Sequence, residues 1–132
     1  MRRVLVAFLA AGAWLITAQA FAHHSFAATY LEDKSVTIEG ELVQLVFRNP
    51  HSFVHVMVTE RDGSTVRYAV EWAGAAQLGI QGITRQTLKT GDRLIISGTP
   101  GRYSEDHRVR MLTLRRPKDG FGWGTRPGEV VE

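Results

Sequence analysis

Histidine is the residue type in this sequence best suited to chemistry. Neutral imidazole is the commonest side-chain ligand of transition metals, and nitrogen-rich tetragonal sites favour Cu(II). The same residues also occur as solvent-facing side chains and in turns, so their positions decide which interpretation holds. The chain has 5 histidines, which are the candidate metal ligands: His23, His24, His51, His55 and His107.

The segment before the first two histidines has the pattern of a secretory signal peptide. Residues 1–22, MRRVLVAFLAAGAWLITAQAFA, begin with two arginines, continue with an apolar run and end in small residues. The apolar run is shorter than the roughly 20 residues that cross a bilayer. We expect cleavage after Ala22, with Ala20 as the second position that fits the small-x-small rule. The mature protein is then periplasmic or secreted, with no stable membrane span.

Either cleavage creates a nitrogen-rich chain terminus. A cut after Ala22 gives His23 a free α-amine beside its own imidazole, and one further imidazole would complete a three-nitrogen copper site. A cut after Ala20 starts the chain with Phe21, Ala22 and His23, whose amine, two amides and imidazole form a square-planar chelate for Cu(II) or Ni(II). The sequence therefore predicts copper as the possible cofactor.

Distance limits which histidine can supply the second imidazole. His51 and His55 are four residues apart, which on a regular strand is about 13 Å, so the two cannot share one ion. His51 follows Asn49 and Pro50 in a predicted loop, whereas His55 lies within a predicted strand. We rank His51 first, His107 second and His55 third.

The body of the chain alternates apolar and polar residues, which predicts β-strands. Val54, Val56 and Val58 are predicted to face the core, a bulge is expected near Gly40, and a short helical turn is expected from Thr84 to Leu88. Five strands with one short helical connection predict an all-β, OB-like Greek-key barrel, although a meander or a small sandwich has the same pattern. The predicted strands are SVTIEGELVQLVF, SFVHVMVT, TVRYAVEW, DRLIISG and HRVRMLTLR.

Composition and the positions of glycine and proline divide the chain into four parts. We expect a signal peptide at 1–22, an N-terminal segment at 23–35, the β-domain at 36–116 and a Gly/Pro-rich C-terminal tail at 117–132. Without residues 1–22, Lys and Arg fall from 16 to 14 against 13 Asp and Glu, a net charge near +1. A nearly neutral, exported domain argues against nucleic acid as a partner.

Three motifs resemble a family of small exported bacterial proteins of unknown function. They are HHSFAATY after the signal peptide, NPHSF at the start of the second strand and TRQTLKTGDRLIISGTP before the last. The resemblance covers roughly residues 23 to 114. It implies export and a compact β-domain, and it brings no known activity.

Two functions remain as expectations, and neither is catalysis, because no nucleophile elbow, phosphate loop or zinc-protease motif is present. The first is a binding protein that captures copper through the mature N-terminus and a loop histidine. The second is a metal-free OB-like module for a peptide, glycan or envelope protein. In an OB-fold the loops between strands one and two and between strands four and five flank the binding face, so its candidate ligand-binding residues are Arg48, Asn49, Phe53 and Tyr103.

Overall fold

The structure is a computed structural model, and it describes residues 26–124. One helical turn over residues 26–29 precedes the first strand. Among the described residues no helix is long and apolar enough to span a membrane. The elements that follow are β1 (Val36–Val46), β2 (Ser52–Thr59), β3 (Thr65–Trp72), α2 (Ala75–Ile80), β4 (Arg93–Pro100), η1 (Ser104–Asp106), β5 (Arg108–Arg116) and β6 (Phe121–Trp123).

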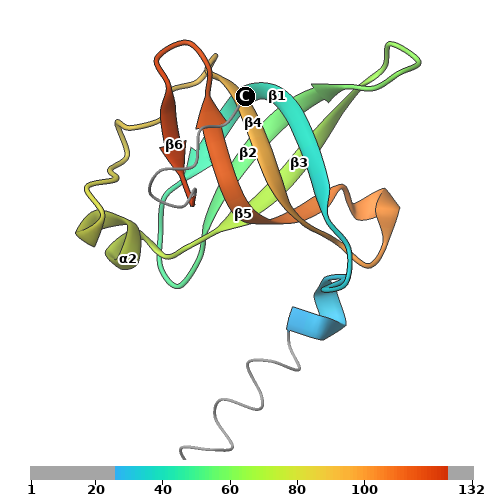
Figure 1. Ribbon diagram of the computed structural model, residues 1–132, viewed down its shortest axis with the longest axis horizontal. Helices are drawn as coiled ribbons and strands as arrows, with labels where there is room; N and C mark the ends of the chain where they lie inside the picture. The colour runs from blue at the N-terminus through green and yellow to red at the C-terminus, as the bar shows by residue number, and fades with distance from the viewer. Residues whose placement is uncertain (1–25, 125–132) are drawn as a thin grey trace, which may run out of the picture.

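Strands β1 to β5 form a closed barrel (Figure 1). The sheet order is β3-β2-β1-β4-β5, and an additional parallel pairing between β3 and β5 joins its two ends. All other neighbours in the barrel are antiparallel. This is the strand arrangement of an OB-fold, with a helical connection between β3 and β4. The predicted fold class, an all-β five-stranded barrel, is confirmed.

The core follows the predicted alternation. Val54, Val56 and Val70 are completely buried, and Trp72 is 2% exposed. Val54 of β2 is paired with Val70 of β3, and the two face the same interior because directly opposed residues of antiparallel strands point the same way. Leucines and isoleucines of β1, β4 and β5 fill the rest of the interior, namely Ile38, Leu42, Leu94, Ile96 and Leu114.

The helix lies elsewhere than predicted. Residues Thr84 to Thr87 form a turn in which the Gln86 amide donates to the Thr84 hydroxyl at 3.2 Å, while the helix, α2, occupies Ala75–Ile80. Two glycines stand at the ends of α2: Gly74 is its N-cap, and Gly82, with φ of +79°, follows its C-terminal end. Leu78, completely buried, anchors this short helix to the core.

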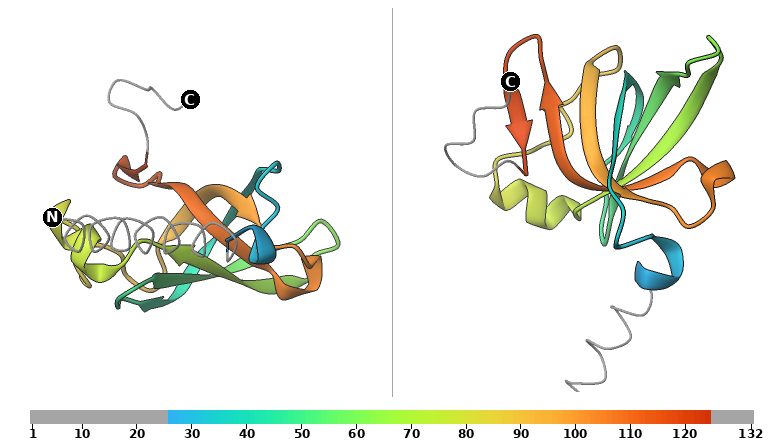
Figure 2. Two further views of the ribbon diagram at one scale, coloured as in Figure 1. Left: turned by 90° about the horizontal axis from the view of Figure 1, so that it is seen from below. Right: turned by 45° about the vertical axis from the view of Figure 1, so that its right-hand side comes forward.

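A sixth strand, which the sequence pattern did not predict, extends the sheet beyond the barrel. Strand β6 pairs with β5 and lies beside it above α2 (Figure 2, right). Trp123 of β6 packs edge-on against Trp72 at 5.4 Å, and its indole Nε1–H donates to Gln81 Oε1 at 2.6 Å. The end of β6 is thereby fixed against the segment that follows α2.

The β1–β2 bulge lies a little further along β1 than expected. The register between β1 and β2 shifts between Leu42 and Gln44, whereas Gly40 is regularly paired. Leu42 bonds the β4 approach instead: its amide donates to Asp92 O and its carbonyl accepts from the Gly91 amide, both at 2.8 Å. The loop that carries the TLKTGD sequence thus supplies the backbone hydrogen bonds of β1 at its irregularity.

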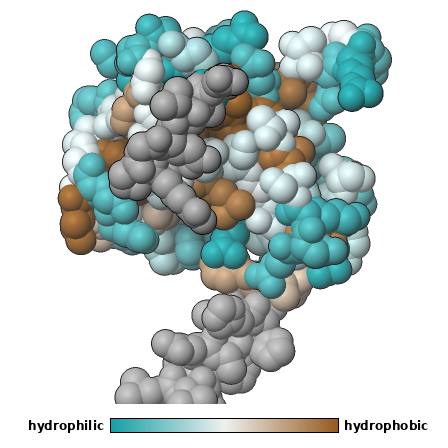
Figure 3. All heavy atoms as spheres, viewed as in Figure 1, coloured by the Kyte–Doolittle hydropathy of each residue, from teal (hydrophilic) through white to brown (hydrophobic). Residues whose placement is uncertain are grey.

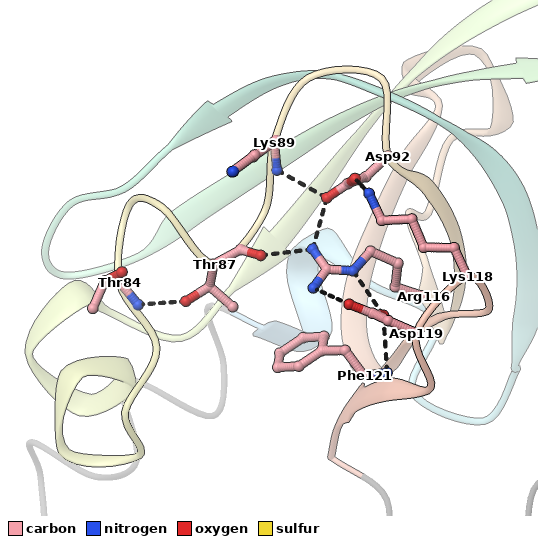
Figure 4. Close-up of polar contacts among 8 residues, drawn as sticks. All are labelled: Thr84, Thr87, Lys89, Asp92, Arg116, Lys118, Asp119 and Phe121. Carbon is pink, nitrogen blue, oxygen red and sulfur yellow. Dashed lines mark hydrogen bonds and ion pairs between the residues drawn. The ribbon is translucent and has the colours of Figure 1, made fainter.

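Asp92, at the end of that loop, is 3% exposed and holds the β5–β6 turn in place (Figure 4). Its carboxylate accepts from Arg116 Nη1 at 2.8 Å and from the Lys89 amide at 2.9 Å, and it pairs with the Lys118 ammonium. Burial alone would raise the pKa of Asp92, but these donors outweigh it and lower the pKa to about 2. Arg116 Nη1 also donates to Thr87 O at 2.7 Å, so the cluster joins three segments.

The Asp92 cluster predicts an acid-dependent stability. The folded-state pKa of Asp92 lies below its ordinary value of 3.8, so its contribution is complete at neutral pH and is lost as the pH falls from about 4 to about 2. We expect Asp92→Asn to lower the free energy of unfolding at neutral pH by roughly 2–3 kcal/mol. In urea unfolding across this pH range, the Asp92→Asn variant should lose less stability toward acid than the native chain does. The exposed Asp33→Asn control should keep the native pH dependence. An unchanged pH dependence in Asp92→Asn would contradict the assignment.

Close approach of β4 and β5 gives a second prediction. A Cβ at Gly98 would lie 2.1 Å from Arg110 O and 2.8 Å from Val109 Cγ1. We expect Gly98→Ala to destabilise the barrel by about 3 kcal/mol or more in urea unfolding, because backbone must move. Gly79→Ala is the matched control: it has no atom within 4 Å and lies in α2, so about 0.5–1 kcal/mol of stabilisation is expected.

Candidate functional site

The outer face of the barrel carries its polar cluster where β3 meets β5. Ala69 pairs with Arg108, and Glu71 pairs with Arg110 across this parallel seam. These positions alternate with buried Val70 and therefore point away from the core. We call this surface the seam face.

The segment before β1 covers part of the seam face, at the lower end of the barrel in Figure 1. Tyr30 forms an isolated bridge with Gly101, and the Leu31 amide donates to Pro100 O at 3.0 Å. The Arg102 amide donates to Thr29 O at 2.9 Å. Backbone bonds to the β4–β5 connection thus fix this segment.

Glu71 is the centre of the cluster and is only 8% exposed. The Tyr30 hydroxyl donates a short hydrogen bond to Glu71 Oε2, and Arg108 Nη2 lies 3.4 Å from the same oxygen. Arg108 Nε also donates to the Tyr30 oxygen at 3.0 Å. Burial raises the pKa of Tyr30, the bond to Glu71 raises it further and Arg108 opposes both, so the phenol remains protonated and a donor.

His51 faces this carboxyl group from the β1–β2 loop. Its Nδ1 lies 3.5 Å from Glu71 Oε1, and 43% of its side chain is exposed. The Phe26 ring packs edge-on against the imidazole with ring centroids 6.1 Å apart. Phe26 is in turn covered by the Arg110 guanidinium at 3.9 Å. His51, the first-ranked candidate ligand, is therefore partly exposed and contacts both Glu71 and Phe26.

The other two histidines in the described range lie in different surroundings. His55 is on β2, where it stacks near Phe53 with ring centroids 6.4 Å apart. Burial lowers the pKa of His55, and the charge of Arg67 lowers it further. His107 follows η1 with φ of 43° and packs edge-on against Tyr68 at 5.2 Å.

No complete metal centre is formed by the residues at 26–124 alone, because they contain no group of three or more His, Cys, Asp or Glu able to hold an ion. His23 and His24, the candidate ligands at the mature terminus, lie outside the described residues.

The Asn-Pro-His stretch has a clear structural task. Asn49 Oδ1 accepts from the Ala76 amide at 3.0 Å at the start of α2, and the Asn49–Pro50 peptide is cis. A Cβ at Gly74 would lie 2.5 Å from Pro50 O, so the β1–β2 loop and the helix fit together only with glycine there. This packing sets the position from which His51 reaches Glu71.

The four candidate ligand-binding residues are spread over the site and its surroundings. Two guanidinium groups lie over the Phe53 ring, that of Arg48 at 5.6 Å and that of Arg108 at 5.7 Å from its centroid. Tyr103 is 60% exposed in the β4–β5 loop. Asn49 holds α2 as described above. The surface in Figure 3 is otherwise largely hydrophilic, with apolar side chains in small separate areas.

A cavity of about 250 Å³ adjoins the cluster. Its walls come from the helical turn before β1, the β1–β2 loop, β3, α2, β5 and β6, and they include Phe26, His51, Glu71, Trp72, Arg110 and Trp123. A larger open groove of about 830 Å³ runs along β1 and the β2–β3 hairpin, and its lining contains no histidine. The small cavity is therefore the one linked to the candidate ligand His51.

Sequence reasoning missed Glu71 and Tyr30. Glu71 is a single carboxylate inside the apolar strand sequence YAVEW, and it had no visible partner because Tyr30 is 41 residues and Arg108 is 37 residues away. A lone acidic residue in an otherwise buried strand is the signal that was available, since such a residue needs nearby donors.

The Tyr30–Glu71 bond predicts how firmly the N-terminal segment is held. Tyr30→Phe removes the donor, and we expect protection from hydrogen exchange to fall at the Leu31 and Arg102 amides, which hold this segment to the barrel. The Val56 amide within β2 should keep its protection. Unchanged exchange at both segment amides would show that the backbone bonds suffice without the phenol.

Comparison with known proteins places the chain in a family. A search of curated proteins finds no match. One family model matches residues 13–110, a range that ends in β5 at the seam and includes Tyr30, His51 and Glu71. The match covers most of the chain and confirms the resemblance to a family of unknown function. The protein therefore belongs to DUF6152, a family of unknown function.

Proposed function

We propose that the mature protein is an exported copper-binding protein. Removal of residues 1–22 would leave His23 with a free α-amine, and this residue together with His51 would bind one Cu(II) through three nitrogens. The protein would capture or carry the ion, since no further catalytic group is required for binding.

The observation that carries the proposal is the position of Phe26 against His51. The two rings are 6.1 Å apart, and only two residues separate Phe26 from His23. Three residues of chain span at most about 10 Å, and His23 adds the length of its own side chain. A chain of this length would allow the amine and imidazole of His23 to reach the His51 ring.

The partner of His51 suits a metal ligand. Metal-bound histidine commonly donates its second ring N–H to a carboxylate, which fixes the tautomer and the ring orientation. Glu71 Oε1 is 3.5 Å from His51 Nδ1, which leaves Nε2 as the nitrogen for the ion. Tyr30 and Arg108 in turn hold Glu71 in place, so the imidazole has a fixed support.

The proposal is tested by titrating Cu(II) into purified protein that begins at His23. We expect about one Cu(II) per chain, with nitrogen hyperfine structure in the electron paramagnetic resonance spectrum. His51→Ala, and separately acetylation of the α-amine of His23, should each weaken binding by about tenfold or more, because each removes a nitrogen ligand. Intact mass of the exported protein reports the cleavage position.

The matched controls are His55→Ala and His107→Ala, which remove imidazoles that have other surroundings in the structure. Both variants should bind copper like the parent chain. If His51→Ala and the chain with an acetylated terminus also bind as tightly as the parent, the three-nitrogen site is wrong.

A further inference from the structure

We propose that the cavity of about 250 Å³ beside Trp72 binds a small carboxylate with an apolar body. This inference does not depend on copper. It rests on an unpaired buried donor, an uncompensated cation and the shape of the apolar wall, each of which is taken in turn.

The donor is the indole of Trp72. The side chain lines the cavity and is 2% exposed, and its Nε1–H has no hydrogen-bond acceptor among residues 26–124. A buried N–H without a partner costs about 1–3 kcal/mol, so a ligand acceptor that shifts the cavity wall enough to reach this N–H would be favoured. Trp123, on the same cavity, is different because its Nε1–H already donates to Gln81 Oε1 at 2.6 Å. Trp72 is therefore the indole that needs an acceptor.

The cation is Arg110. Its guanidinium covers Phe26 at 3.9 Å, and within the described part of the chain it forms no ion pair. The neighbouring arginines of β5 differ, since Arg108 pairs with Glu71 and Arg116 pairs with Asp92. Glu71 also lines the cavity, but Tyr30 and Arg108 already donate to its Oε2. Among the described residues Arg110 is therefore the cation on the wall without a carboxylate partner, which favours an anionic acceptor.

The remaining wall sets the size and character of the ligand. Trp72 and Trp123 meet edge-on at 5.4 Å, and Met111 lines the cavity beside them. A volume of 250 Å³ equals roughly eight water molecules in the liquid, which admits one ring or a short branched chain but not a nucleotide or an oligosaccharide. A carboxylate toward Arg110 and the Trp72 N–H, with an apolar body against the indoles, satisfies all three features.

The test uses benzoate as the probe and the metal-free protein that begins at His23, with a chelator present. In ¹⁵N–¹H spectra, benzoate should move the Trp72 Nε1–H resonance in a saturable manner, with a smaller change at Trp123. Benzamide is the neutral analogue of nearly the same shape, and it should bind about tenfold more weakly or worse. Trp72→Phe and Trp123→Phe assign the two indole signals.

Two variants separate the charge from the fold. Arg110→Gln should weaken benzoate by about tenfold while the circular dichroism spectrum stays unchanged, and Arg61→Gln in the β2–β3 turn should leave the affinity as it was. Trp72→Phe should also weaken binding, because it removes the donor together with part of the indole wall. The proposal is overturned if benzoate causes no saturable shift, or if benzamide binds as tightly as benzoate. It is also overturned if benzoate binds only after residues 23–25 are deleted.

Discussion

Glu71 is a carboxyl group buried on the outside of a barrel, and the candidate site depends on how it is satisfied. Burial of such a group is unfavourable unless hydrogen-bond donors surround it. The donors come from Tyr30 before the first strand and from Arg108 on the last strand of the barrel, while His51 approaches from the β1–β2 loop. One side chain therefore ties together three segments that are remote in sequence. The same contact holds the N-terminal segment beside the imidazole that we propose as a copper ligand.

A second buried carboxylate, Asp92, does comparable work on another part of the barrel. It joins the approach to β4 with the β5–β6 turn through Arg116 and Lys118. The two clusters differ in what they leave open. The donors of Asp92 are all used to join segments of the fold, whereas the seam face keeps a half-exposed imidazole and a cavity. The seam face is for that reason the better candidate for binding.

The features that the sequence predicted are those in which apolar and polar residues alternate with a period of two. Alternation in β2 identified Val54, Val56 and Val58 as core residues, and five such runs predicted the barrel. The helix was misplaced because Gly74 and Gly82 look like breakers until the structure shows that they stand at its two ends. Strand β6 was missed because its three residues, two of them aromatic, are too few to show a period. Contacts between residues 37 and 41 positions apart, such as those of Glu71, leave no periodic signal at all.

The parallel pairing of β3 with β5 also sets the order in which the molecule can be completed. Residues 69–71 and their partners at 108–110 are 39 positions apart in sequence. Until they meet, β3 has a free edge and Glu71 lacks Arg108. Closure of the ring is a contact of long sequence separation, which is slow to form compared with the local hairpins. A chain that stops before β5 would thus have most of its strands but would lack the β5 wall of the cavity beside Trp72, so the binding that we propose there would require the completed barrel.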